Sequence, residues 1–115
     1  MDDDSNTRIV FTSILKQMGF EVECVANGKD ALKKYKKAQN INQPFDVVIL
    51  DLNIPGGMDG LEVYRKLTNL NPEIRAYLTS GYLDDSIWEE CTKSGFKGFL
   101  NKPIRVEDLQ KILVN

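Results

Sequence analysis

The chain has 115 residues, enough for one domain with a single core, and 42% of them are hydrophobic and 28% charged. Its net charge of -2 indicates no nucleic-acid surface, and no apolar stretch approaches the roughly 20 residues that span a bilayer. Because the acidic start at 2–4 is also unlike a signal peptide, we expect a cytoplasmic domain that contacts neither nucleic acid nor membrane.

The chain contains no histidine. This excludes Ser-His-Asp and Cys-His nucleophile systems, as well as zinc sites that need imidazole. It also means that the chain cannot carry a phosphohistidine. A histidine that passes phosphoryl groups to this chain would therefore belong to another domain or another protein.

Two helices and one strand are predicted in the first 40 residues. Ser5 or Asp4 can cap a helix that runs to about Met18 and has an apolar stripe on one face. Phe20–Ala26 alternates between apolar and acidic residues, which predicts a strand near a sheet edge. A second helix with a lysine-rich outer face follows the turn at 27–28.

Strands and helices continue to alternate in the rest of the chain. The run 45–50 is unbroken and apolar, as expected for a central parallel strand that is buried on both faces. The other predicted elements are a helix over about 61–69, a strand over 74–79, a helix over about 84–94, a strand over 98–101 and a last helix over about 106–113. This alternation predicts an α/β fold in three αβα layers, with a parallel sheet between helices.

Three polar residues fall at the carboxyl ends of predicted strands, namely Asp51, Thr79 and, just after the last strand, Lys102. The acidic group 2–4 would join them if a strand preceded it. Ligands of open parallel sheets bind at this edge. A carboxylate there can attack phosphorus, neighbouring carboxylates can hold Mg²⁺, and an ammonium and a hydroxyl can contact phosphoryl oxygens. The set therefore predicts a phosphoryl-transfer site.

The sequence resembles the receiver domains of two-component response regulators and hybrid histidine kinases over its whole length. The segments that carry the resemblance are Asp2-Asp3-Asp4, Asp51-Leu52-Asn53-Ile54-Pro55 followed by Gly60, Thr79-Ser80-Gly81-Tyr82 and Phe99-Leu100-Asn101-Lys102-Pro103. The resemblance implies a flavodoxin-like parallel sheet with strand order 2-1-3-4-5. It also implies a phosphorylation-dependent switch in a two-component phosphorelay, with a histidine kinase or a histidine phosphotransfer domain as partner.

The same resemblance implies the parts of a magnesium-assisted phosphoacceptor site. Asp51 would accept the phosphoryl group, with self-phosphorylation and self-dephosphorylation as its only chemistry. Asp2 and Asp3 would bind Mg²⁺ together with Asp51, and Asn53 would give its backbone carbonyl to the metal.

Further roles are implied for residues on the later strands. Thr79 and Lys102 would contact the phosphoryl group. Thr79 would also couple to Phe99, which stands where tyrosine is commoner in the family, so that the ring turns inward on phosphorylation. The peptide bond before Pro103 would be cis.

The chain departs from the family at its start, because only Met1 precedes the acidic pair where about five apolar strand residues are usual. We therefore interpret residues 1–115 as one receiver domain that is truncated at its N-terminus relative to the family, with its first strand largely missing. Three outcomes are open: the natural protein begins earlier, a second copy fills the gap by strand exchange in a homodimer, or the neighbouring strands close up.

Two alternative functions remain. The first is a Mg²⁺-dependent phosphohydrolase of the haloacid dehalogenase type, which also uses an aspartate nucleophile at a strand end. That family needs a second aspartate two residues later as general acid, and this chain has Asn53 there. The second is a pseudo-receiver, a binding module that has the fold but is not phosphorylated.

Overall fold

Three parallel strands form the centre of the computed structural model, which describes residues 1–81 and 85–113. They are β1 (Val48–Asp51), β2 (Ala76–Ser80) and β3 (Gly98–Asn101), and they lie side by side in the order β1-β2-β3. The register pairs Asp51 with Thr79 across β1 and β2. This order agrees with strands 3, 4 and 5 of the arrangement that the resemblance implied.

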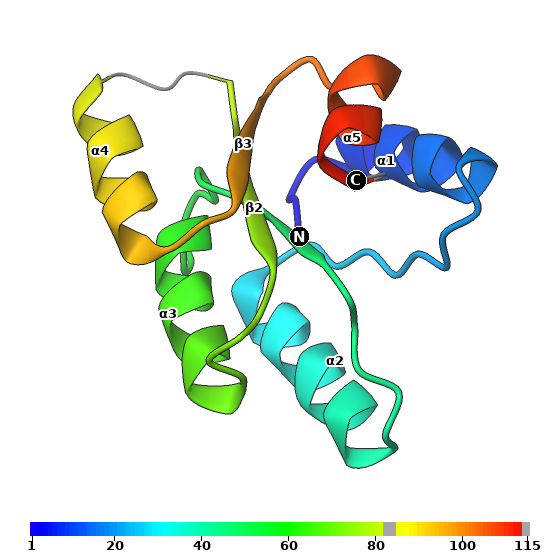
Figure 1. Cartoon of the computed structure of the whole chain (residues 1–115), viewed down its shortest axis with the longest axis vertical. Coiled ribbons are helices and arrows are strands. Elements are labelled where there is room, and N and C mark those ends of the chain that lie inside the picture. Colours follow the sequence, from blue (N-terminus) through cyan, green and yellow to red (C-terminus); the bar gives the residue numbers. More distant parts are fainter. Residues whose placement is uncertain (82–84, 114–115) are drawn as a thin grey trace.

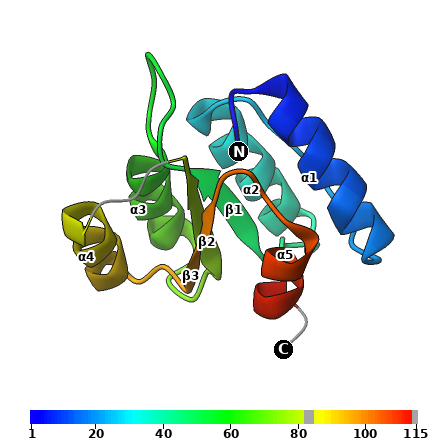
Figure 2. The same ribbon diagram turned by 90° about the horizontal axis from the view of Figure 1, so that it is seen from above.

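Helices cover both faces of this sheet, as Figures 1 and 2 show. On one side lie α1 and α5, and on the other lie α2, α3 and α4. The bounds are Ser5–Gln17 for α1, Gly28–Asn40 for α2, Gly60–Leu70 for α3, Asp85–Ser94 for α4 and Val106–Leu113 for α5. The predicted three-layer αβα architecture is confirmed, and the residues 82–84, where the helix over 84–94 was predicted to begin, lie outside the described residues.

Each face of the sheet has its own hydrophobic core. Leu50 and Leu78 pack with side chains from α2, α3 and α4, whereas Ile49 and Leu100 pack with side chains from α1 and α5. Successive residues of a strand point to opposite faces, so a strand covered on both sides must be apolar throughout. The apolar run before Asp51 forms β1 for this reason, but the strand begins only at Val48 and lies at the edge of the described three-stranded sheet, whereas a central strand was predicted.

The strand predicted over Phe20–Ala26 is wrong, because this segment joins no ladder in the structure. Its alternating pattern is that of a strand, but backbone pairing needs a neighbour along the whole length. The backbone that lies beside this segment consists only of the first residues of the described chain. The amide of Asp2 donates to the carbonyl of Val25 at 3.0 Å, which is a backbone bond between the segment and the start of the chain.

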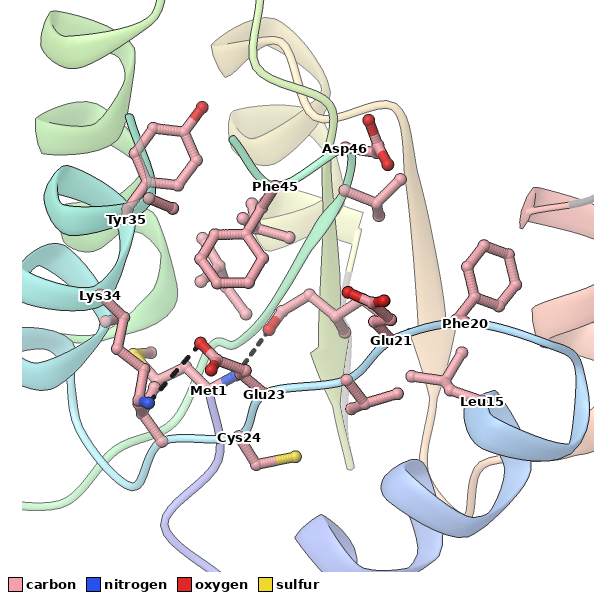
Figure 3. Close-up of a pocket in the computed structure, with 18 of the residues that line it drawn as sticks. Met1, Leu15, Phe20, Glu21, Glu23, Cys24, Lys34, Tyr35, Phe45 and Asp46 are labelled. Atoms are coloured by element: carbon pink, nitrogen blue, oxygen red, sulfur yellow. Dashed lines mark hydrogen bonds and ion pairs between the residues drawn. The ribbon is translucent and has the colours of Figure 1, made fainter. Parts of the chain in front are cut away.

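Met1 and Asp2 lie between this segment and β1. The Met1 ammonium donates to the carbonyl of Ile49 at 2.8 Å, and the amide of Asp51 donates to the carbonyl of Met1 at 3.0 Å. This is the hydrogen-bond pattern of a parallel ladder. Beyond Met1 a cavity of about 930 Å³ separates the two walls (Figure 3), so closing up of the neighbouring strands, one of the three open outcomes, is not what this structure shows.

Two smaller features complete the description of the fold. No helix within residues 1–81 and 85–113 is long and apolar enough to cross a membrane. Cys24 and Cys91 are both free thiols.

Candidate functional site at the carboxyl edge of the sheet

The ends of β1 and β2 bring Asp51 and Thr79 side by side. The two residues are register partners, and their exposed fractions are only 2% and 1%. Parallel strands end at a common edge, so the order of the strands in the sheet fixes this pairing. Ser80, which follows Thr79, is fully buried and was not singled out in the sequence, although it directly follows a predicted strand-end residue.

Lys102 reaches the same point from the segment after β3. Its Nζ lies 2.9 Å from Oδ2 of Asp51 and 2.9 Å from Oδ2 of Asp2. Its backbone amide donates to the carbonyl of Ser80 at 3.0 Å, which ties this segment to the end of β2. The peptide bond between Lys102 and Pro103 is cis, the isomer that the resemblance implied.

Three carboxylates converge beside this lysine. One oxygen from each of Asp2, Asp3 and Asp51 can be chosen so that all lie within 4.8 Å of one another. Asp2 and Asp51 are buried, whereas Asp3 is exposed. Oδ2 of Asp2 is buried, and its partner is the Lys102 ammonium at 2.9 Å. Three carboxylates this close together form an all-oxygen cluster that fits a hard divalent cation such as Mg²⁺.

Asn53 holds the loop that follows β1. Its backbone amide donates to Oδ1 of Asp51 at 3.1 Å, and its side-chain amide donates to Oγ of Ser80 at 3.2 Å. The second oxygen of Asp51 accepts from Lys102, so both carboxylate oxygens are oriented by other residues. The role of the Asn53 carbonyl toward a metal stays a prediction.

Burial and charge act in opposite directions on the site. Burial raises the pKa of Asp51 above its ordinary value, although the hydrogen bonds from Lys102 and Asn53 oppose the shift. Burial lowers the pKa of Lys102, but its contacts with the carboxylates of Asp2 and Asp51 outweigh burial, so the net shift is upward. Lys102 is therefore held as a cation, but its charge only partly offsets the effect of burial on the Asp51 carboxylate.

The Met1 ammonium lies in the site's surroundings, and its burial was not predicted from the sequence. Burial lowers its pKa, and its hydrogen bond to Ile49 fixes the chain immediately before Asp2. A chain terminus is ordinarily solvated, so nothing in the residue type predicted this position.

The comparisons with known proteins bear on this arrangement. A sequence model described as the response regulator receiver domain matches residues 1–114. The chain belongs to the response regulator receiver family. This receiver domain is 32% identical over 110 residues to a cyclic di-GMP phosphodiesterase of Thermotoga maritima, which covers 96% of the receiver domain. The receiver domain spans only 28% of that protein's length.

Solved structures agree with the assignment. The receiver domain matches chemotaxis protein CheY4 of Vibrio cholerae with a TM-score of 0.87 and 30% identity, over 98% of its own length and 91% of that chain. It matches a chain of the CheX–CheY–BeF₃–Mg complex from Borrelia burgdorferi with a TM-score of 0.86 and 27% identity, over 98% and 83% of the two chains. The chain is thus a CheY-like receiver domain of two-component phosphorelay signalling.

Proposed function

We propose that Asp51 is the residue that accepts the phosphoryl group, and that a partner histidine kinase or histidine phosphotransfer domain is the donor. The observation that carries this proposal is the convergence of Asp51, Thr79 and Lys102 at one buried edge. Asp51 is the only one of these three that can act as a carboxylate nucleophile.

The transfer is a single displacement at phosphorus. A carboxylate oxygen of Asp51 forms the new O–P bond as the N–P bond of the donor phosphohistidine breaks. The electron pair of that bond returns to the imidazole nitrogen, and the ring leaves as neutral histidine because its other nitrogen keeps a proton. Lys102 offsets charge on the phosphoryl oxygens, and the Thr79 hydroxyl donates a hydrogen bond to one of them.

Mg²⁺ is the cofactor that suits the three carboxylates. Asp2, Asp3 and Asp51 would hold it, with the Asn53 carbonyl as a further oxygen ligand. When bound, it would neutralise negative charge on the phosphoryl oxygens. Because Lys102 Nζ contacts both Asp2 and Asp51, this cation partly balances the cluster before any metal binds.

The switch proposed for this domain uses Thr79 and Phe99. Phe99 is the register partner of Leu78, the residue before Thr79. Movement of the threonine therefore changes the packing next to the Phe99 ring. The ring packs against Trp88 of α4 with centroids 4.2 Å apart. A change at the phosphoryl site could thus pass from Thr79 to the surface formed by α4, β3 and α5.

The proposed setting is cytoplasmic, and the only chemistry is self-phosphorylation and self-dephosphorylation. Gly81 leaves room for water near the site, because a Cβ added there would meet no atom of the described residues within 4 Å. Water attack on phosphorus would release inorganic phosphate and restore the Asp51 carboxylate. Strand exchange in a homodimer stays a prediction for the gap beside Met1.

One experiment separates this proposal from the two alternatives. The protein is incubated with Mg²⁺ and either acetyl phosphate or beryllofluoride, and its intact mass and phosphate release are measured. A receiver gains one adduct per chain and releases phosphate slowly. Rapid multiple turnover would instead identify a phosphohydrolase, and the absence of any adduct would identify a pseudo-receiver.

A further inference from the structure

Ser80, at the end of β2, contacts both of the chain segments that orient the Asp51 carboxylate. Its side chain is fully buried. Its carbonyl accepts from the backbone amide of Lys102 at 3.0 Å, and its hydroxyl accepts from the side-chain amide of Asn53 at 3.2 Å. Asn53 follows β1 and Lys102 follows β3, the strands on either side of β2. Ser80 is therefore a shared attachment point for two segments that are far apart in the sequence.

Each of these two segments binds a different oxygen of Asp51. The backbone amide of Asn53 donates to Oδ1 at 3.1 Å, and Nζ of Lys102 donates to Oδ2 at 2.9 Å. Together with the two contacts to Ser80, these bonds form a closed ring that runs through four residues. A ring restrains its members more than separate bonds do, because no member can turn without disturbing a bond elsewhere in the network.

This restraint is relevant to chemistry because an aspartate carboxylate has little orientation of its own. Its last torsion is broad and roughly two-fold, so its two oxygens exchange places unless other groups hold them. In the proposed phosphoryl transfer, one oxygen of Asp51 must face phosphorus, and alignment of the reacting atoms contributes a large part of the rate. A group that fixes the position of Oδ1 would therefore speed the transfer through its effect on Asp51.

The Asn53 side of the ring depends on a side chain. β1 ends at Asp51, and the segment 55–57 of the following loop is an exposed Pro-Gly-Gly sequence. The hydrogen bond from the Asn53 side chain to Ser80 ties the start of this loop to β2, a strand that is buried along its whole length. This bond thereby holds the Asn53 backbone amide in position toward Asp51.

The identity of residue 80 decides whether the ring is closed. A change of its side chain keeps the carbonyl that accepts from the Lys102 amide. Alanine at this position would lack the hydroxyl, so the Asn53 side-chain amide would lose its acceptor. Serine thus supplies one contact through its backbone and a second contact that alanine or glycine could not supply.

We propose that Ser80 is a positioning residue for phosphoryl transfer, which acts through the side-chain amide of Asn53 to hold Oδ1 of Asp51 in its reactive orientation. The inference rests on the proposed function of Asp51 as the phosphoacceptor. It adds a role for the Asn53 side chain to the metal-binding role predicted for the Asn53 carbonyl.

A double-mutant cycle tests the proposal. Wild type, Ser80→Ala, Asn53→Ala and the double variant are compared for their initial rate of labelling by acetyl phosphate at saturating Mg²⁺, at a temperature where all four are folded. Each single variant should be labelled about three- to ten-fold more slowly, the effect of one hydrogen bond of ordinary net strength. Because both changes break the same bond, the double variant should be no slower than the slower single variant. An unchanged rate in Ser80→Ala, or two effects that multiply, would overturn the proposal.

Amide hydrogen exchange tests the geometry without any phosphoryl donor. In Ser80→Ala, the backbone amide of Asn53 should exchange faster than in wild type, because its alignment with the carboxylate is lost. The amides of Leu52 and Lys102 should stay protected, since both donate to backbone carbonyls of β2 that the substitution keeps. Unchanged exchange of the Asn53 amide, or equal acceleration of all three amides, would overturn the proposal.

Asn71→Ala is the matched control. The Asn71 side-chain amide donates to the hydroxyl of Tyr35 at 3.0 Å, which is the same kind of bond, but Asn71 lies before β2 begins, whereas the site lies where β2 ends. This variant should lose stability in urea and yet be labelled at the wild-type rate. Slowing equal to that of Ser80→Ala would show that the rate only follows stability, and would overturn the proposal.

Failure of the proposed function has a different signature. In that case wild type would gain no label, or Asp51→Asn would be labelled as fast as wild type. The role of Ser80 in phosphoryl transfer would then be wrong as well, and the exchange of the Asn53 amide would still show whether Ser80 holds this loop.

Discussion

At the scale of single residues, Gly60 sets how closely α3 approaches the phosphoacceptor strand. A Cβ at this position would lie 2.6 Å from the backbone oxygen of Asp51. We expect Gly60→Ala to destabilise the protein by about 1–3 kcal/mol, because backbone cannot move aside as a flexible side chain can. Urea unfolding measures this. Gly57→Ala is the matched control, since its nearest atom is 4.0 Å away, and an equal loss in both variants would contradict the account.

The raised pKa of Asp51 predicts how the free energy of unfolding depends on pH when no metal is bound. Because its pKa is raised in the folded state, the folded protein binds more protons than the unfolded chain between the two pKa values. Stability contributed by this group therefore falls as pH rises through that window, and the full cost is present above the folded-state pKa. Asp51→Asn should raise the free energy of unfolding at pH 7 in the presence of a chelator, and the gain should shrink toward acid.

The pH series compares wild type, Asp51→Asn and Asp46→Asn by urea unfolding. Asp46 is an exposed carboxylate and serves as the control for loss of one negative charge. A gain that is the same in both variants, or that grows toward acid, would contradict the assigned cause.

The sequence located these residues because their types are informative at strand ends. Asp51, Thr79 and Lys102 are polar groups where an apolar run stops, and parallel topology brings such positions together. The Met1 ammonium could not be found this way, because its place depends on a hydrogen bond to a distant strand rather than on any local pattern.

At the scale of elements, the contact between α4 and β3 provides a reporter of the switch. Trp88 is the only tryptophan in the chain, is 49% exposed and packs on Phe99. If phosphorylation at Asp51 reorients Phe99, the emission of Trp88 should change with the same dependence on beryllofluoride as adduct formation. Phe99→Leu should reduce the change without preventing the adduct, and a fluorescence signal that is unaffected by this variant would contradict the coupling.

Element prediction succeeded where burial alone decides structure. The apolar run before Asp51 and the periodic helices were recognisable because each buries a defined face. The strand predicted over Phe20–Ala26 was wrong because alternation shows only which side chains prefer burial. A strand also needs a neighbouring backbone to pair with. Within the described residues, the backbone bonds of this segment are from the Asp2 amide to the Val25 carbonyl and from the Phe20 amide to the Leu15 carbonyl, and these form no ladder.

At the scale of the whole molecule, Mg²⁺ binding should couple to folding. The three carboxylates come together only in the folded chain, so a metal that binds them stabilises that state. At a metal concentration of about 100 times the dissociation constant, the gain is about 2.7 kcal/mol. Thermal unfolding at constant ionic strength measures it.

Asp2→Asn should remove most of this stabilisation, because it alters a buried oxygen ligand, whereas Asp46→Asn should leave it intact. If Mg²⁺ stabilised wild type and Asp2→Asn equally, the metal would be bound elsewhere.

The central claim is that one buried aspartate at the end of β1 receives the phosphoryl group. The most direct measurement is intact-mass spectrometry of wild type and Asp51→Asn after incubation with acetyl phosphate and Mg²⁺. Wild type should gain the mass of a single phosphoryl group, and Asp51→Asn should gain none while remaining folded by circular dichroism. Labelling of Asp51→Asn to the same extent as wild type would contradict the account.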